Sequence, residues 1–321
     1  MITTVGSLAL VWLGLWGVLT VAVRLLYPLV RPSLMRLHPQ NGATLLLLFW
    51  AAPATLSLLA ASMLYSPVLE SWLVRPHCHG DCLQHSPHTN ATSVAIAAIV
   101  LAGFVVAWLL FSFARQLQEG RHLVRRFEAL ASERDGYLEL ESPSPVVFTL
   151  GWWNPRVFVS DSLLQQCTAE QLDVILGHEQ AHRKRRDNLR LLLMRIFCLF
   201  LPSSSRQQVI HDLQIMCEQA CDFYAAQKHG AIAVAETLVH VGRLVKEASR
   251  PHGSMAFNGG DLALRVRALL DYEARTVLSR WQLLALGMVT VFAMLLVLDP
   301  LHHGAEWVIA VLENSGAHLH W

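Results

Sequence analysis

Two histidines and a glutamate stand close together in the segment Gly177 to His182, which reads G-HEQAH. An apolar stripe with helical spacing precedes them, at Leu172, Ile175 and Leu176. Residues four apart on a helix point the same way, so His178 and His182 can bind one metal ion. Glu179 would polarise a metal-bound water and accept its proton. Because zinc brings the pKa of bound water toward neutrality, the segment predicts hydrolysis of amide bonds.

A second motif, Cys217 to Asp222, reads C-EQAC-D in another helical pattern. Glu218 would complete a His-His-Glu zinc site whose fourth position stays open for water. Asp222, on the same helix face, would hold a ligand imidazole by its free N–H. The alternative ligands are His211 and Asp212. Cys217 and Cys221 are interpreted as small reduced core residues, with a redox or metal-trapping role as the alternative.

A β hairpin is predicted ahead of the motif helix. Branched and aromatic residues run from Val146 to Leu150, Gly151 and Asn154-Pro155 turn the chain, and Val157 to Val159 resume the pattern. Zinc peptidases of the zincin class bind substrate as an added strand along such an edge. The alternative is that the hairpin only forms the core of a sheet.

The composition indicates a membrane protein. Hydrophobic residues make up 54% of the 321 residues and charged residues 15%, against roughly 25% charged in soluble domains. A bilayer needs about 20 apolar residues, and four uncharged stretches approach or exceed that length: Met1–Val23, Ala43–Tyr65, Thr92–Ala114 and Trp281–Leu298. The first lacks the basic start and cleavage site of a secretory signal, so an uncleaved span is predicted.

The distribution of basic residues predicts the orientation. If the N-terminus lies outside, 24 of the 25 Lys and Arg residues fall on the cytosolic side, and only Arg75 lies outside. We therefore expect a multi-pass protein of the bacterial cytoplasmic membrane. Its predicted parts are a three-span membrane domain at 1–114, a cytosolic zinc peptidase domain at 115–280, a fourth span at 281–298 and an external tail at 299–321. The net charge of +1 argues against nucleic acid as a direct partner.

The predicted external segments are rich in metal-binding residues. Eight of the 16 histidines lie in them. The loop 66–91 holds His77, Cys78, His79, Asp81, Cys82, His85 and His88, and the tail holds His302, His303, His318 and His320. Such imidazole and thiolate ligands suit zinc or copper, so an external metal ion is a candidate signal. In the alternatives, Cys78 and Cys82 form a disulfide that leaves only the histidines, or the loop is an ordinary polar one.

Three further features of the cytosolic part are open to interpretation. Ser249 to Gly260 is broken by proline and glycine, and we expect an exposed loop. Leu189 to Leu201 is too short to span a membrane and predicts either an interfacial or a buried helix. His240 and Arg243 are unranked candidates for stabilising an oxyanion.

The motifs resemble a known family. HEQAH followed by Arg185, Arg186, Asp187 and Asn188, then EQACD, and the stretch Ser144 to Leu164 (SPVVFTLGWWNPRVFVSDSLL) are similar to the BlaR/MecR-type membrane metallopeptidases. The four-span layout agrees. The resemblance implies an α-helical membrane protein with an inserted α+β zincin domain of the gluzincin type. It also implies that His178, His182 and Glu218 bind zinc, and that Glu179 is the catalytic base.

Members of that family relay an external signal to cytosolic proteolysis of a BlaI-like repressor, and cleavage of the chain itself is expected in the loop 249–260. The β-lactam receptors carry a penicillin-binding domain after the last span. Here Pro300 to Trp321 follow and contain no lysine for an S-x-x-K motif, so we expect the peptidase and topology without the antibiotic sensor. The alternatives are an HtpX-like quality-control protease and a non-catalytic metal-binding receptor. The intact Glu179 argues against the receptor.

Overall fold

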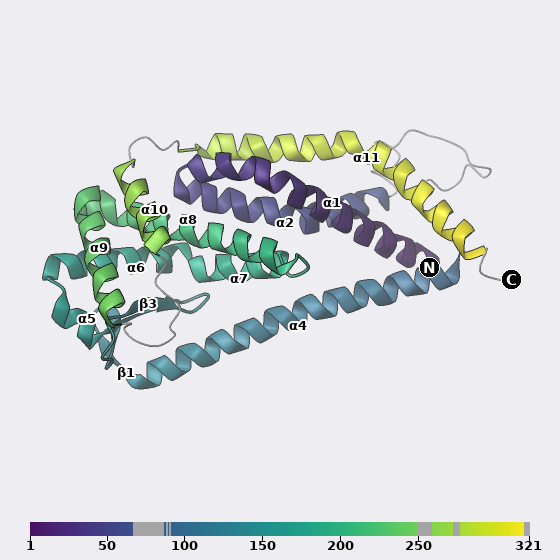
Figure 1. The fold of residues 1–321 in the computed structure, drawn as a ribbon. Coiled ribbons are helices and arrows are strands. Elements are labelled where there is room, and N and C mark those ends of the chain that lie inside the picture. The colour runs from purple at the N-terminus through teal and green to yellow at the C-terminus, as the bar shows by residue number, and fades with distance from the viewer. Residues whose placement is uncertain (67–86, 88, 90, 249–258, 272–276, 318–321) are drawn as a thin grey trace. The chain divides into compact units, whose positions relative to one another are not determined.

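The fold is described from a computed structural model (Figure 1), which describes residues 1–66, 87, 89, 91–248, 259–271 and 277–317. The chain forms two compact units. One comprises Met1–Leu29, Leu48–Phe111 and Leu278–Trp321, and the other comprises Val30–Leu47 and Ser112–Val277. The second unit thus includes the connection between the first two predicted spans, which the sequence analysis placed in the membrane domain.

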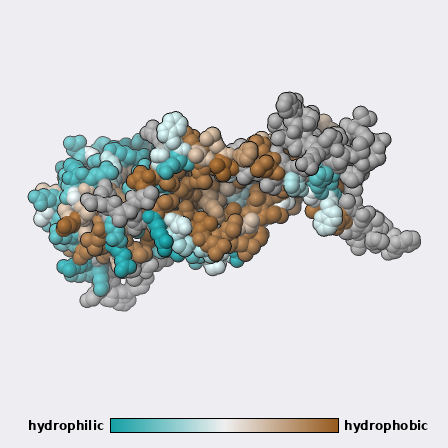
Figure 2. Space-filling view, turned by 90° about the horizontal axis from the view of Figure 1, so that it is seen from above, coloured by the Kyte–Doolittle hydropathy of each residue, from teal (hydrophilic) through white to brown (hydrophobic). Residues whose placement is uncertain are grey.

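Among the described residues, three helices are long and apolar enough to cross a membrane: α1 (Ile2–Arg36), α2 (Pro39–Leu64) and α4 (Thr92–Leu130). They confirm the first three predicted spans and indicate a multi-pass membrane protein. The fourth predicted span lies within α11 (Arg280–Ala317). The apolar run found among the described residues of α11, Trp281–Thr290, is shorter than a bilayer requires, so the fourth span stays a prediction. On the face seen in Figure 2, hydrophobic residues cover the long helices and hydrophilic residues gather over the second unit.

A small mixed sheet supports the second unit. Its order is β1 (Ala131–Arg134), β2 (Tyr137–Leu140), β4 (Arg156–Ser160) and β3 (Val147–Leu150), with β2 and β4 parallel and the other pairs antiparallel. β3 and β4 form the predicted hairpin. The β1–β2 hairpin was not predicted, although Asp135-Gly136 is a hairpin-turn signal and Gly136 adopts the positive φ of 91° that such a turn requires.

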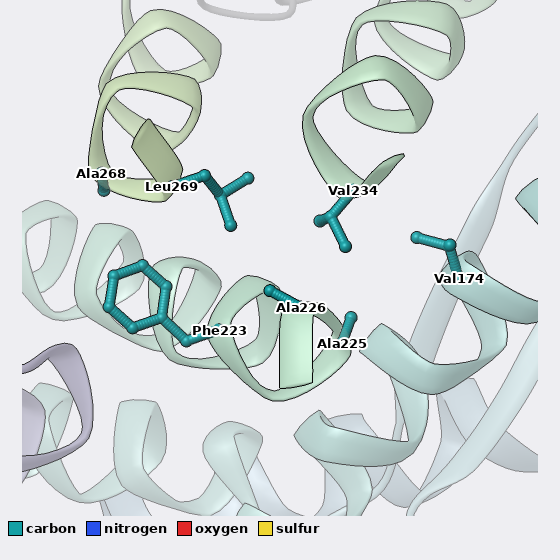
Figure 3. Packing of buried hydrophobic residues seen from close by; sticks show 7 residues of the cluster. All are labelled: Val174, Phe223, Ala225, Ala226, Val234, Ala268 and Leu269. Carbon is teal, nitrogen blue, oxygen red and sulfur yellow. The ribbon is translucent and has the colours of Figure 1, made fainter. Parts of the chain in front are cut away.

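The described part of the unit also contains the helices α5 (Asp161–Gln166), α6 (Ala169–Arg185), α7 (Asp187–Phe197), α8 (Ser203–His229), α9 (Ala231–Ala248) and α10 (Gly259–Leu270). α8 packs against α6, α7, α9 and α10. Figure 3 shows the apolar cluster where α6, α8, α9 and α10 meet, with Phe223, Val234 and Leu269 in its centre. Leu192 and Met194 of α7 are fully buried, so the segment 189–201 contains a helix of the domain core.

The start and end of α6 fix the position of the first motif. Thr168 caps the helix, and its hydroxyl and the Gln171 side chain form a reciprocal capping box. At the other end, Arg186 adopts a left-handed conformation with φ 53°, which is uncommon for a residue other than glycine. Helix α6 therefore ends at Arg185, and α7 begins at Asp187, directly after the left-handed residue.

Residues 30–47 pack on α8 within the second unit. Arg31 donates two hydrogen bonds to the buried carboxylate of Asp212, at 2.6 and 2.7 Å. The His38 ring contacts Phe223 edge-on, with 5.3 Å between ring centroids. Gly42 lies so close to Met216 that an added Cβ would stand 3.0 Å from the Met216 methyl carbon. These contacts hold the helix that carries the second motif.

Several predicted features lie outside the described residues. They are the external-loop residues His77, Cys78, His79, Asp81, Cys82 and His85, together with His88, His318 and His320. Residues 249–258 of the predicted exposed loop also lie outside, while Gly259 and Gly260 begin α10.

Candidate metal centre

The three predicted ligands converge on one point between α6 and α8. The Nε2 atoms of His178 and His182 are 3.1 Å apart. Glu218 places Oε2 3.5 Å from Nε2 of His178 and Oε1 3.4 Å from Nε2 of His182. Two imidazole nitrogens and one carboxylate, all close together, form a donor set that fits zinc.

Each ligand imidazole is held from behind by a carboxylate. Nδ1 of His178 lies 2.9 Å from Oδ1 of Asp222 without the angle of a hydrogen bond, and the role predicted for Asp222 stays a prediction. Nδ1 of His182 lies 3.0 Å from Oδ2 of Asp187. A carboxylate at Nδ1 keeps the proton on that nitrogen, so that the Nε2 lone pair faces the metal. Asp187 belongs to the stretch that carries the family resemblance, but no role was predicted for it. The left-handed turn at Arg186 is what brings it back to His182.

Arg265 of α10 binds two of these acidic groups. It donates to Asp222 through two nitrogens at 2.8 and 2.7 Å, and a third nitrogen lies 3.0 Å from Oε2 of Glu218. Burial opposes ionisation of Glu218, but the charge of Arg265 and the hydrogen bonds of the two imidazoles outweigh it and hold the pKa of Glu218 well below its usual range. Burial also opposes ionisation of Asp222, but the charge and the hydrogen bonds of Arg265 outweigh it and lower the pKa of Asp222.

Glu179 follows His178 on α6 and is among the residues that line the same cavity as the ligands. It is buried, and Thr149 of β3 donates a hydrogen bond to its Oε2 at 2.6 Å. Asn188, at the start of α7, donates to the main-chain oxygen of Thr149 at 2.8 Å. The sequence analysis identified Glu179 but neither Thr149 nor Asn188 as part of the site. Both follow from the packing of β3 on α6.

A cavity of about 680 Å³ opens onto these residues. Its lining includes the three ligands and Glu179, and residues 145–149 at one side. Much of the remaining wall is apolar, with Val174, Val234, Leu238 and Val241 from α6 and α9. In the sheet that the described residues form, β3 is an edge strand, a position at which an extended peptide can pair, although Asn188 already donates to the main-chain oxygen of Thr149.

The alternative ligands take part in other contacts. Asp212 is bound by Arg31, and Nε2 of His211 lies 3.4 Å from Asp261. Neither residue belongs to either of the two groups of described residues that could hold a metal ion, His178–His182–Glu218 and His182–Asp187–Cys221. The structure therefore favours Glu218 as the third ligand.

The candidates for oxyanion stabilisation do not line the cavity that the described residues form. The His240 ring is engaged at 3.0 Å with the main-chain oxygen of Gln166, and Arg243 is exposed on α9. The structure gives neither residue a place beside the ligands.

The two cysteines of the second motif are buried core residues. Burial raises the pKa of the Cys217 thiol strongly, and raises that of Cys221 to about 12. The Cys221 thiol donates to Oδ2 of Asp187 at 3.4 Å. Protonated thiols in these positions fit the interpretation as small core side chains.

Comparison with known proteins agrees with the geometry. The family model described as BlaR1 peptidase M56 matches residues 85–269, which is more than half of the chain. Neither the curated proteins nor the solved structures contain a match. The matched range includes both motifs, the strand β3 and Arg265.

Proposed function

Because this chain belongs to the BlaR1 peptidase M56 family, a family of membrane metallopeptidases, we propose that it is a membrane-bound zinc endopeptidase that cuts a cytosolic protein. His178, His182 and Glu218 bind the zinc ion, and Glu179 is the catalytic base. The observation that carries the proposal is the convergence of the three ligand side chains within 3.5 Å of one another, with Glu179 on the wall of the same cavity.

Different residues of the chain have different roles in the proposed peptide hydrolysis. A bound zinc ion supplies a Lewis acid that polarises the scissile carbonyl and lowers the pKa of water. Glu179 takes the proton from the attacking water and delivers it to the leaving amine. Asp222 and Asp187 fix the orientation of the two imidazoles. The edge of β3 aligns the substrate as an added strand beside Glu179.

The proposed substrate is a BlaI-like repressor, the chain itself, or both. The family resemblance supports a regulatory substrate. The concentration of basic residues between the third and fourth predicted spans supports a cytosolic one. A housekeeping role similar to that of HtpX would instead lead to cleavage of many membrane proteins. Measuring whether the repressor is cut distinguishes the two roles.

Metal removal tests the proposal directly. The full-length protein, purified in detergent, should contain about one zinc ion per chain and should cut a BlaI-like winged-helix repressor. Chelation by 1,10-phenanthroline should stop cleavage, and added zinc should restore it, because the ligands alone cannot activate water. Cleavage that is insensitive to the chelator would contradict the proposal. An uncut repressor, together with many accumulated membrane proteins in cells lacking the activity, would favour the HtpX-like alternative.

The topology gives a second expected outcome. A reporter fused after residue 200 should lie in the cytosol and one fused after residue 315 outside, because 24 of 25 basic residues then face the cytosol. Paired alkaline phosphatase and green fluorescent protein fusions measure both positions. A cytosolic signal at residue 315 would contradict the predicted fourth span and the predicted external tail.

We propose an external zinc or copper ion as the signal, and the abundance of histidine in the loop 66–91 and the tail supports it. In α11, His302 is buried, and its Nε2 lies 3.2 Å from Glu306. Replacing His77, His79, His85 and His88 by Ala should abolish metal-triggered repressor cleavage. The zinc content of the peptidase site, measured by mass spectrometry, should stay unchanged. A variant that still responds to both metals would contradict this proposal.

A further inference from the structure

Thr149 is a polar residue on an otherwise apolar face of β3. Val147, two residues earlier, packs with Val157, Val159 and Ile175 in the cluster between the sheet and α6. Side chains alternate along a strand, so Thr149 lies on the same face as Val147 and is directed to α6. A valine would satisfy the packing at this position, and the hydroxyl therefore needs another explanation.

The hydroxyl of Thr149 binds the proposed catalytic base. It lies 2.6 Å from Oε2 of Glu179, whose exposed fraction is only 6%. A buried carboxylate oxygen that lacks a hydrogen-bond partner is costly, so a donor at this position stabilises the side chain. In the described part of the chain, Thr149 makes the only hydrogen bond to this carboxylate, and it occupies one of the two oxygens. The other oxygen, Oε1, is left to accept a proton.

Thr149 is itself held in place by the segment that orients a zinc ligand. Asn188 donates to the main-chain oxygens of Thr149 and Gly151, at 2.8 and 3.3 Å. The residue before it, Asp187, contacts His182 at 3.0 Å. The edge strand, the carboxylate of Glu179 and one ligand imidazole are thus connected through Asn188 and Thr149.

We propose that Thr149 is a positioning residue for peptide hydrolysis, whose hydroxyl fixes the orientation of the Glu179 carboxylate relative to a substrate lying on β3. The inference rests on the proposed function, in which Glu179 is the base. Thr149 contacts Glu179 and not the metal ligands, so its loss should affect the rate of the chemical step and leave zinc in place.

The test compares Thr149→Val with Thr149→Ser in the zinc-loaded full-length protein, using the repressor as substrate. Thr149→Val keeps the shape and removes the hydrogen bond, and we expect kcat to fall about 10- to 100-fold, as for other residues that orient catalytic groups. KM, zinc content and the melting temperature should stay at the wild-type values. Thr149→Ser should restore most of the lost kcat. Thr20→Val is a control, because the Thr20 hydroxyl binds only the Trp16 carbonyl of its own helix.

A double-mutant cycle shows whether Thr149 acts through Glu179. In a Glu179→Gln background, Thr149→Val should cause no further loss, because the group that it orients is already gone. An equal loss in both backgrounds, or wild-type kcat in Thr149→Val, would overturn the inference and leave the proposed function standing. Wild-type protein without zinc-dependent cleavage would overturn the proposed function, and the inference with it.

Discussion

Glu179→Gln should leave zinc bound and lower kcat for repressor cleavage by about 10²- to 10⁴-fold, the usual contribution of a general base. The amide is close to the carboxylate in shape but cannot accept the proton of the attacking water. Because Glu179 is not one of the three converging ligands, the metal content should equal that of the wild type. Single-turnover kinetics and mass spectrometry of the same preparation measure the two quantities.

The control for this prediction is His178→Ala, which removes a proposed zinc ligand and leaves the proposed base intact. It should lose both zinc and activity. If Glu179→Gln also loses zinc, Glu179 is a ligand and the assignment of Glu218 is wrong. If Glu179→Gln keeps wild-type kcat, another group is the base.

Arg265→Met should destabilise both the fold and the metal site. The side chain of Arg265 is largely buried between Asp222 and Glu218, and its removal leaves two carboxylates without their shared counter-charge. Breaking such a buried pair costs about 3–5 kcal/mol of the free energy of unfolding. Since both carboxylates act on the metal site, we expect zinc affinity to fall by about 10- to 100-fold. Thermal unfolding and competition with a zinc-binding dye measure these effects.

A surface ion pair supplies the control for Arg265→Met. Lys228 lies 2.7 Å from Asp173, and both side chains are more than half exposed. Such a pair contributes about 0–1 kcal/mol, so Lys228→Met should change neither stability nor zinc affinity measurably. Equal behaviour of the two variants would show that Arg265 is not required to hold Glu218 and Asp222.

The sequence was sufficient for those parts of the site that depend on local spacing. His178 and His182 face one point because they are four apart on a helix, and the same rule relates Glu218 to Asp222. The β3–β4 hairpin and the three long spans also follow from short-range patterns. In each case the information lies within one element of secondary structure.

The parts that were missed depend on long-range packing or on an unusual backbone conformation. Asp187 reaches His182 only because Arg186, a residue other than glycine, adopts a left-handed turn. Arg265 lies 43 residues from Asp222 along the chain, and no motif surrounds it. Thr149 has the pattern of an ordinary strand residue. Its contact with Glu179 depends on how the sheet packs on α6.

The contacts of residues 30–47 with α8 affect which fragments of this protein can fold. A fragment that begins at Ser112 would lack Arg31, so the buried carboxylate of Asp212 would lose both of its hydrogen bonds. It would also expose the surfaces of Met216 and Phe223 that Gly42 and His38 cover. We therefore expect the segment Ser112–Val277 to be less stable when it is separated from residues 30–47. Chimeras and truncations should therefore keep residues 30–47 together with the segment Ser112–Val277.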